Sequence, residues 1–148
     1  MILYGPPGSG KTTLARMFAQ SPGFAFEEHS AVQVGLAEVR AVRERALARR
    51  EGQGLRTVFF LDEIHRFNKS QQDALLPLVE EGLVTLIGAT TENPAFEING
   101  ALLSRLRIYA LEQLSAADVE AVLKRAIALG EPGPTPVADD AIALLASH

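Results

Sequence analysis

The sequence of 148 residues contains no cysteine, which excludes disulfide bonds and thiolate metal sites. No apolar run approaches the roughly 20 residues that a helix needs to span a bilayer. No segment has the pattern of a signal peptide either. We therefore expect a cytoplasmic protein without a membrane among its partners.

An excess of positive charge is also missing. The chain has 14 lysine and arginine residues against 18 aspartate and glutamate residues, which gives a net charge of −4 at pH 7. A protein that binds nucleic acid over most of its surface is basic. Any contact of this chain with nucleic acid must therefore be local or depend on other parts. The hydrophobic share of 47% is ordinary for a soluble globular protein.

The most specific motif lies near the start, where residues 5–12 read Gly-Pro-Pro-Gly-Ser-Gly-Lys-Thr. This run fits the phosphate-binding loop pattern, and it lies between a short apolar run and a segment of helical composition. Glycines let successive backbone N–H groups point at phosphate oxygens, and the helix N-terminus adds positive charge. Lys11 would reach the β- and γ-phosphates, and the Thr12 hydroxyl would bind Mg²⁺. The expected phosphate-binding residues are Gly5, Pro6, Pro7, Gly8, Ser9, Gly10, Lys11, Thr12 and Thr13.

Two adjacent carboxylates follow the apolar run Thr-Val-Phe-Phe-Leu at residues 57–61. Such a run is typical of a central parallel strand that is covered on both faces. Asp62 and Glu63 come next, at the carboxyl edge where open α/β sheets bind ligands. We expect Asp62 to hold Mg²⁺, directly or through water, and Glu63 to polarise the attacking water.

Further polar positions complete the expected site with less specific signals. Thr91, or its neighbour Thr90, follows the next apolar run, and its hydroxyl would hold the attacking water or a γ-phosphate oxygen. Arg105 lies at a helix-to-strand junction, where a guanidinium can complete the nucleotide site of another subunit. No chemical role is assigned to His65, because a single histidine is more often structural. The three histidines have no metal-ligand spacing.

Strand and helix patterns alternate up to about residue 112 and are helical thereafter. We expect a parallel α/β domain over residues 1–112, followed by the beginning of a helical domain over residues 113–148. Residues 131–136 indicate a stiff connector before a last helix. A helix predicted over residues 36–51 has its arginines scattered around its circumference, which favours a solvated face over a nucleic-acid-binding stripe.

Two details of the first domain are predicted from local signals. Asn68 would cap a helix that runs to about Glu81 and is bent or shortened at Pro77. Residues 89–94 are polar and predict a turn after the strand at residues 83–88.

The runs at residues 5–15 and 60–66 resemble the Walker A and Walker B elements of AAA+ ATPases. A narrower resemblance, to the replication-associated recombination protein A family, comes from the stretches at residues 65–73, 87–94 and 102–105. This similarity extends over nearly the whole chain. Its most specific part is Phe-Asn-Lys-Ser-Gln-Gln-Asp at residues 67–73.

The resemblance implies a P-loop core with a sheet ordered 5-1-4-3-2 and a helical lid. It implies ATP and Mg²⁺ as cofactors, Lys11 and Glu63 as catalytic residues, Thr91 as sensor 1, and Arg105 as an arginine finger acting in trans. It also implies a homo-oligomer with DNA-dependent ATP hydrolysis at stalled or gapped replication forks, associated with the nucleoid in a bacterium. Fork, gapped or single-stranded DNA and a single-stranded-DNA-binding protein are the implied partners. The family's N-terminal segment, lid arginine and C-terminal oligomerisation region are missing, so we expect a fragment.

Three other classes stay open. Holliday-junction branch-migration motors share several of these runs but insert a DNA-engaging hairpin, for which Asp62 and Thr91 lie too close in sequence. Clamp-loader subunits usually carry a cysteine where this chain has Leu106. A scaffold that binds nucleotide without hydrolysing it typically lacks the phosphate-loop lysine or the glutamate, and both Lys11 and Glu63 are present.

Overall fold

The computed structural model describes residues 1–130 and 138–146. The chain divides into two compact units, Met1–Glu112 and Gln113–His148. In the described ranges no helix has the length and apolar character needed to cross a membrane. The connector expected at residues 131–136 lies outside the described residues.

The first unit is built around a five-stranded parallel sheet in the order β2-β3-β4-β1-β5. The strands are β1 (Ile2–Tyr4), β2 (Phe24–Ser30), β3 (Arg56–Asp62), β4 (Val84–Thr90) and β5 (Ile108–Ala110). Read from the other edge, this is the order 5-1-4-3-2 that the sequence resemblance implied, and that expectation is confirmed. Because the strands are parallel, the carboxyl ends of β1, β3 and β4 meet at one edge of the sheet.

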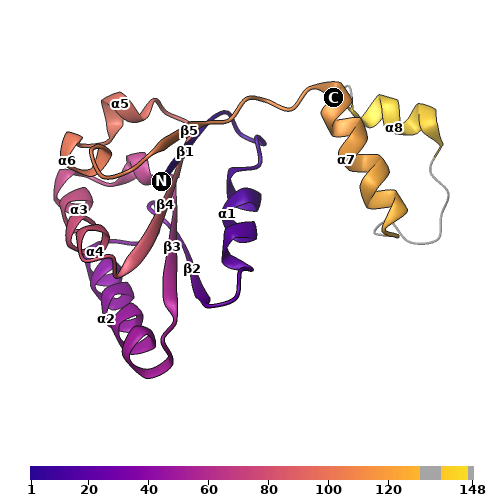
Figure 1. Cartoon of the computed structure of the whole chain (residues 1–148). Helices are drawn as coiled ribbons and strands as arrows, with labels where there is room; N and C mark the ends of the chain where they lie inside the picture. Colours follow the sequence, from indigo (N-terminus) through magenta and orange to yellow (C-terminus); the bar gives the residue numbers. More distant parts are fainter. Residues whose placement is uncertain (131–137, 147–148) are drawn as a thin grey trace. The chain divides into compact units, whose positions relative to one another are not determined.

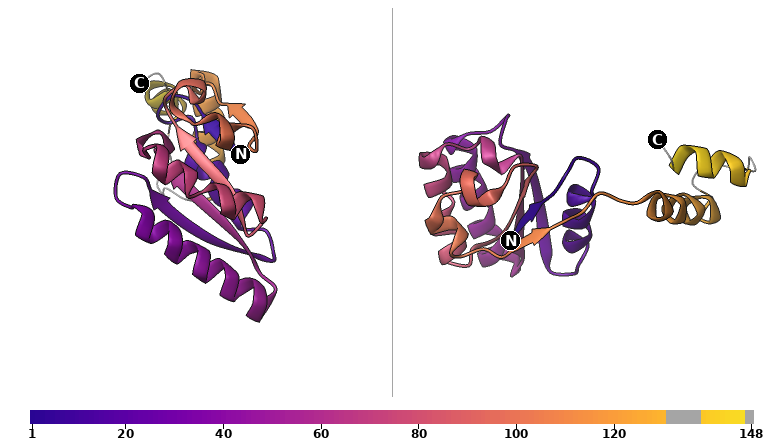
Figure 2. Two further views of the ribbon diagram at one scale, coloured as in Figure 1. Left: turned by 90° about the vertical axis from the view of Figure 1, so that its left-hand side faces the viewer. Right: turned by 90° about the horizontal axis from the view of Figure 1, so that it is seen from above.

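Helices cover both faces of this sheet. Helix α1 (Lys11–Ala19) lies alone on one face, and the remaining helices of the unit lie on the other (Figure 1), as the view from above also shows (Figure 2). The second layer comprises α2 (Leu36–Gln53), η1 (Ile64–Arg66), α3 (Lys69–Asp73), α4 (Leu76–Glu80), α5 (Pro94–Glu97) and α6 (Gly100–Leu103).

The apolar core is divided by the sheet, because successive strand side chains point to opposite faces. In β3, Val58 and Phe60 belong to the cluster that includes Ala15 of α1. Phe59 and Leu61 belong to the larger cluster beneath α2 and its neighbours. The continuous apolar run of β3 therefore reflects a strand that is covered on both faces, as the sequence predicted.

The segment between η1 and β4 contains two short helices, where the sequence predicted one. Asn68 caps α3 as predicted, and its side chain accepts a hydrogen bond from the Gln71 backbone N–H at 3.0 Å. The helix ends at Asp73, and α4 begins at Leu76 with Pro77 in its first turn. Proline lacks the N–H that a helix interior requires but fits a first turn, so it separates the two helices.

Strand β4 is longer than the sequence predicted. Ala89 and Thr90, expected in a polar turn, form its last two residues and are fully buried. The turn begins at Thr91 instead. After the turn, the Asn93 side chain accepts a hydrogen bond from the Ala95 N–H and caps α5, a helix that the sequence analysis did not predict. The buried hydroxyl of Thr90 has hydrogen-bond partners in His65 and the Glu92 N–H. These partners replace water, so threonine can occupy a buried position in the strand.

In its described residues, the second unit consists of α7 (Ala116–Ala128) packed against α8 (Asp139–Ala146). Helix α7 begins at a capping box. The Ser115 hydroxyl accepts from the Asp118 N–H at 3.2 Å, and the Asp118 carboxylate accepts from the Ser115 N–H at 2.9 Å. Hydrogen bonds from the Ser115 side chain and backbone lower the pKa of Asp118.

Candidate functional site

The glycine-rich loop follows β1 and leads directly into α1. Gly8 and Gly10 have φ values of 76° and 85°, in the left-handed region that glycine adopts without strain. Gly10 is the N-cap of α1, whose first N–H groups have no acceptor within the helix. The first turn of α1 contains no acidic residue to offset the positive end of its dipole. The loop and helix together form an anion-binding terminus.

Gly5 satisfies a different requirement. A Cβ atom at this position would lie 2.3 Å from the backbone carbonyl oxygen of Leu111, the residue after β5. The Gly5 N–H donates to the carbonyl of Thr90 at 3.2 Å. Gly5 is therefore a glycine because the loop begins in close contact with the sheet, and its role is packing.

The side chain of Lys11 is folded back on this loop. Its ammonium group donates to the carbonyl oxygens of Gly5 and Pro6, both at 2.7 Å, and lies 3.4 Å from the Ser9 hydroxyl. These partners are neutral, and among the described residues no carboxylate pairs with Lys11. A residue that is only 9% exposed thus brings an uncompensated positive charge to the site, which favours an anionic ligand.

The acidic pair lies at the end of β3. Glu63 has φ 54° and ψ 38° and is the one non-glycine residue with positive φ in the described part of the chain. Side chains other than glycine rarely adopt this conformation, which costs on the order of 1 kcal/mol and recurs at functional sites. The Asp62 carboxylate accepts a hydrogen bond from the Glu63 N–H at 3.0 Å, which fixes the turn.

These elements meet at one cleft of about 360 Å³. The register explains the convergence: Tyr4 of β1 pairs with Thr90 of β4, and Leu61 of β3 pairs with Gly88 of β4. The residues that follow the three strands therefore reach the same edge. The cleft is lined by Pro7, Gly8, Gly10, Lys11, Thr12, Thr13, Asp62, Glu63 and Thr91. Of the expected phosphate-binding residues, Gly5, Pro6 and Ser9 do not line it.

The donor set of the cleft fits a nucleotide with a divalent cation. Lys11 and the N-terminus of α1 provide positive charge and N–H donors for phosphate oxygens. The carboxylate of Asp62 and the hydroxyl of Thr12 provide the hard oxygen ligands that Mg²⁺ prefers, and both line the cleft with Lys11.

His65, to which the sequence analysis assigned no role, contacts two walls of this site. Its Nδ1 atom lies 2.8 Å from the Thr90 hydroxyl, and its Nε2 atom lies 3.3 Å from a carboxylate oxygen of Glu63. The only sequence signal was its position two residues after Glu63. The contact with Thr90 joins residues 25 positions apart and becomes visible only in the folded chain.

Arg105 does not reach the cleft. It follows α6, where its guanidinium donates to the carbonyl of Ala101 at 2.7 Å and pairs with Glu80 at 2.5 Å. Its side chain is 40% exposed. Within one chain Arg105 adds no charge to the site, and its role in trans stays a prediction.

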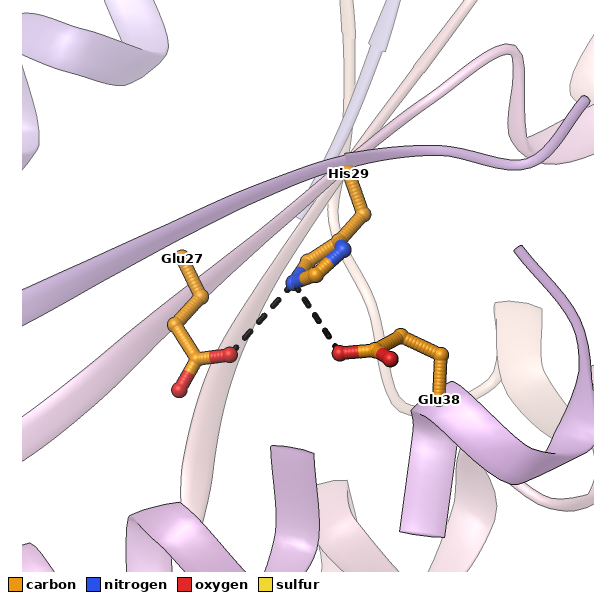
Figure 3. A group of neighbouring side chains, drawn as sticks. All are labelled: Glu27, His29 and Glu38. Carbon is orange, nitrogen blue, oxygen red and sulfur yellow. Dashed lines mark hydrogen bonds and ion pairs between the residues drawn. The ribbon is translucent and has the colours of Figure 1, made fainter. Parts of the chain in front are cut away.

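A second group of titratable side chains joins β2 to α2 (Figure 3). Nε2 of His29 lies 3.4 Å from Glu27 and 3.8 Å from Glu38, so the three side chains are close enough to share a cation. However, Arg45 pairs with Glu27 at 2.5 Å and with Glu38 at 2.7 Å, and Arg49 also pairs with Glu27. Two guanidinium groups already neutralise these carboxylates. The group is therefore an ion-pair network rather than a metal site.

This network keeps Glu27 ionised. Burial acts to raise the pKa of the Glu27 carboxyl, but hydrogen bonds from Arg45, Arg49 and His29 outweigh it and lower the pKa to about 2. Hydrogen bonds to Glu27 and Glu38 raise the pKa of Arg45. Arg45 and Arg49 are therefore engaged in ion pairs with β2 and α2, whereas the sequence analysis expected the arginines of this helix on a solvated face.

Comparison with known families supports the interpretation of the cleft. The model of the ATPase family associated with various cellular activities (AAA) matches residues 1–114. The match includes the glycine-rich loop, the acidic pair and Thr91. The cleft therefore lies in a nucleotide-binding domain of the ATPase type.

Curated relatives narrow the similarity further. The chain is 58% identical over 133 residues to Replication-associated recombination protein A of Coxiella burnetii and 57% identical over 127 residues to the Escherichia coli K12 protein of that name. These alignments cover 90% and 86% of this chain but 30% and 28% of the relatives. ATPase WRNIP1 of Dictyostelium discoideum is 48% identical over 85% of this chain and 14% of its own length. The chain thus spans less than a third of these relatives.

Solved structures show the same architecture. The Holliday junction branch migration motor RuvB of Thermotoga maritima matches with a TM-score of 0.72 and 31% identity, over 98% of this chain and 47% of that chain. Its similarity agrees with the parallel sheet and the phosphate loop described above. The fold, the cleft and the family match together show that this chain belongs to the AAA family of ATPases, where its sequence groups it with the replication-associated recombination proteins A.

Proposed function

We propose that this chain is the ATP-hydrolysing core of a DNA-dependent ATPase that acts in replication-fork maintenance and recombination. The observation that carries the proposal is the convergence of Lys11 and the α1 N-terminus with Asp62 and Glu63 on one cleft. The process is suggested by the relatives' names, which refer to replication-associated recombination and to branch migration at Holliday junctions.

Nucleotide binding exchanges one set of Lys11 partners for another. The ammonium group leaves the Gly5 and Pro6 carbonyls and binds β- and γ-phosphate oxygens, while N–H groups of the loop and of the first turn of α1 hold the remaining oxygens. Asp62 and Thr12 would hold Mg²⁺, and the ion would supply positive charge to neutralise the charge that develops on the phosphates.

Hydrolysis then depends on the residues opposite the loop. Glu63 orients and polarises the water that attacks the γ-phosphorus, and it takes up the proton of that water as the bond to ADP breaks. Thr91 holds the water or a γ-phosphate oxygen through its hydroxyl. The strained turn at Glu63 directs this side chain toward the cleft that it lines.

A complete site needs a further positive charge that the chain does not place in its own cleft. Arg105 lies after the end of α6 with 40% of its side chain exposed, and reaching a second copy of the chain requires it to leave its pairing with Glu80. We therefore infer a homo-oligomer in which Arg105 acts on the neighbouring nucleotide. The chain has a net charge of −4. We therefore infer that local surfaces of this chain, or other parts of the complete natural protein, make the contacts with DNA and with a single-stranded-DNA-binding protein. These contacts would be made in the cytoplasm.

A branch-migration motor is the second candidate, and the structural similarity to RuvB favours it. The chain between Asp62 and Thr91 argues against it, because this stretch forms only η1, α3, α4 and β4 and contains no inserted hairpin. Curated relatives with 57–58% identity also carry the recombination protein name, whereas identity to RuvB is 31%.

The proposal is tested by phosphate release from the complete natural protein carrying Glu63→Gln. The substitution keeps the side-chain volume and removes the charge that activates water, so we expect the rate to fall by about 10²- to 10⁴-fold with ATP binding retained. Lys11→Ala is the matched control, because it should lose nucleotide binding itself. Equal rates for wild type and Glu63→Gln would indicate a scaffold that does not hydrolyse ATP.

DNA dependence is measured in the same assay. Single-stranded, duplex and forked DNA are added at equal nucleotide concentration, and at least one of them should raise the rate of the wild-type protein. A rate that none of the three changes contradicts the DNA-dependent part of the proposal.

A further inference from the structure

We propose that His65 is a positioning residue that holds the Glu63 carboxylate and links it to the strand that leads to Thr91. This inference rests on the proposed function, because it concerns the group that polarises the attacking water. It assigns a role to a residue that neither the phosphate loop nor the acidic pair includes.

The imidazole of His65 lies between the ends of β3 and β4. Its side chain is 8% exposed, and each ring nitrogen has its own partner. Nδ1 meets the hydroxyl of Thr90, the last residue of β4, at 2.8 Å. Nε2 meets the carboxylate of Glu63, which follows β3, at 3.3 Å. A buried ring with two polar partners has one orientation, so it fixes the distance between them.

The partners determine which nitrogen carries the proton. An ionised carboxylate only accepts hydrogen bonds, so Nε2 of His65 donates to Glu63. In the neutral ring Nδ1 then accepts, and the Thr90 hydroxyl donates to it. The alternative acceptor for that hydroxyl, the Glu92 carbonyl, lies farther away at 3.3 Å. The Thr90 oxygen still accepts from the Glu92 N–H at 3.0 Å. One arrangement of protons therefore satisfies every hydrogen bond in the series from Glu92 through Thr90 and His65 to Glu63.

Glu63 needs such a support. It occupies a strained turn, its side chain is 33% exposed, and its carboxylate has rotatable bonds that leave many orientations open to it. A hydrogen bond to one oxygen removes most of these orientations and leaves the other oxygen for water. His65 also affects the side of the cleft that is lined by Thr91, because its partner Thr90 precedes Thr91 in the sequence and is joined to it by a peptide bond. His65 thus connects the position expected to contact the γ-phosphate with the group that prepares the water.

Two amide variants separate the two contacts. The amide nitrogen of glutamine reaches the place of Nε2, so His65→Gln keeps a donor for Glu63 and loses the partner of Thr90. The amide of asparagine reaches the place of Nδ1, so His65→Asn keeps a partner for Thr90 and loses Glu63. The complete natural protein is assayed for kcat and KM with ATP, for nucleotide affinity, and for thermal unfolding.

We expect His65→Asn to lower kcat by about 10- to 100-fold, as loss of a group that orients a reactive residue does. KM and nucleotide affinity should change by less than about threefold, because the contact matters only in the hydrolysis step. His65→Gln should recover most of the lost kcat. A purely structural role would instead lower the unfolding temperature in both variants and reduce their kcat equally, and that result would overturn the inference.

A double variant tests whether His65 acts through Glu63. In the Glu63→Gln background, His65→Asn should cause no further loss of kcat, because the group that it positions is already inactive. Additive losses would contradict a shared route. If Glu63→Gln lowers kcat and His65→Asn does not, the inference fails and the proposed function stands. If Glu63→Gln itself has no effect, the proposed function fails first.

Discussion

Gly5 and Gly8 belong to one motif, but different physical constraints select glycine at each position. Gly8 has a positive φ and open space where a side chain would begin. Gly5 lies against the backbone of Leu111, which cannot move aside as a flexible side chain can. A pattern of glycines in the sequence does not distinguish a position that requires a left-handed conformation from one that requires contact.

The contact predicts the effect of Gly5→Ala. A Cβ atom 2.3 Å from the Leu111 carbonyl forces a backbone shift, which should reduce the free energy of unfolding by about 1–3 kcal/mol. Denaturant titration measures the change. Gly52→Ala is the matched control, because Gly52 lies in α2 with open space around it. Alanine should raise the free energy of unfolding there by about 0.5–1 kcal/mol. An unchanged midpoint for Gly5→Ala would show that Leu111 does not constrain the loop.

Single residues also show where sequence reasoning stops. Lys11, Asp62 and Glu63 were predicted because each belongs to a local pattern whose chemistry depends on residue type and spacing. Thr90 was placed in a turn because threonine and its polar neighbours favour turns. Its place in a buried strand depends on His65, a partner 25 residues away that satisfies its hydroxyl. Local signals do not contain that information.

Secondary-structure elements are held to one another by charge as well as by apolar contact. The carboxylate of Glu27 on β2 is only 7% exposed and binds two guanidinium groups of α2. Removing one partner from such a network leaves the other charges without compensation, which destabilises more than the loss of an exposed pair. The helix is thus fixed to the edge strand of the sheet.

This arrangement predicts acid sensitivity. The pKa of Glu27 falls from its usual 4.5 to about 2 on folding, so its stabilising contribution is complete above about pH 4.5 and is lost as the pH decreases toward 2. Glu27→Gln should lower the free energy of unfolding by about 2 kcal/mol at neutral pH. Between pH 4.5 and 2, the free energy of unfolding should decrease less steeply in this variant than in the wild type. Glu44→Gln, which removes an exposed partner of Arg43, is expected to change the free energy by less than about 0.5 kcal/mol. Parallel pH curves for wild type and Glu27→Gln would contradict the assignment.

Element boundaries followed the strength of the local signal. The Asn68 cap was predicted correctly because it is a capping box, in which side chain and backbone groups only three residues apart bind each other. The helix expected to run on to Glu81 is divided because Pro77 begins a new first turn. Sequence alone left bending and shortening equally open at that proline.

For the whole molecule, alternating strands and helices predict a parallel α/β unit, but they do not determine strand order. The order came from resemblance to a family, and the structure confirms it. The neighbours of each strand depend on how the faces of the sheet pack against the helices. These contacts join residues that are far apart in the sequence. The proposed role of Arg105 also concerns the whole molecule and its assembly. Within a single chain, Arg105 pairs with Glu80 and lies outside the cleft.

Mixing of variants tests that role. Arg105→Ala subunits of the complete natural protein keep their own phosphate loop, and Lys11→Ala subunits keep their Arg105. Each alone should lose ATP hydrolysis by about 10³-fold or more. Mixed assemblies should recover part of the wild-type rate, because some interfaces then combine an intact loop with an intact arginine. Phosphate release measured across mixing ratios gives the answer, and no recovery at concentrations where the subunits assemble would exclude sharing.

The sheet order also has a consequence for biosynthesis. Both neighbours of β1 are strands from much later in the chain: Ile2 pairs with Gly88 on one side and with Ile108 on the other. While the ribosome is still translating the middle of the chain, β1 has no strand beside it. Pairing at such large separation is slow to form, and a nascent chain exposes the unpaired segment meanwhile. The glycine-rich loop that follows β1 therefore gains its neighbours in the sheet, and the contact of Gly5 with Leu111, only after translation has passed residue 111.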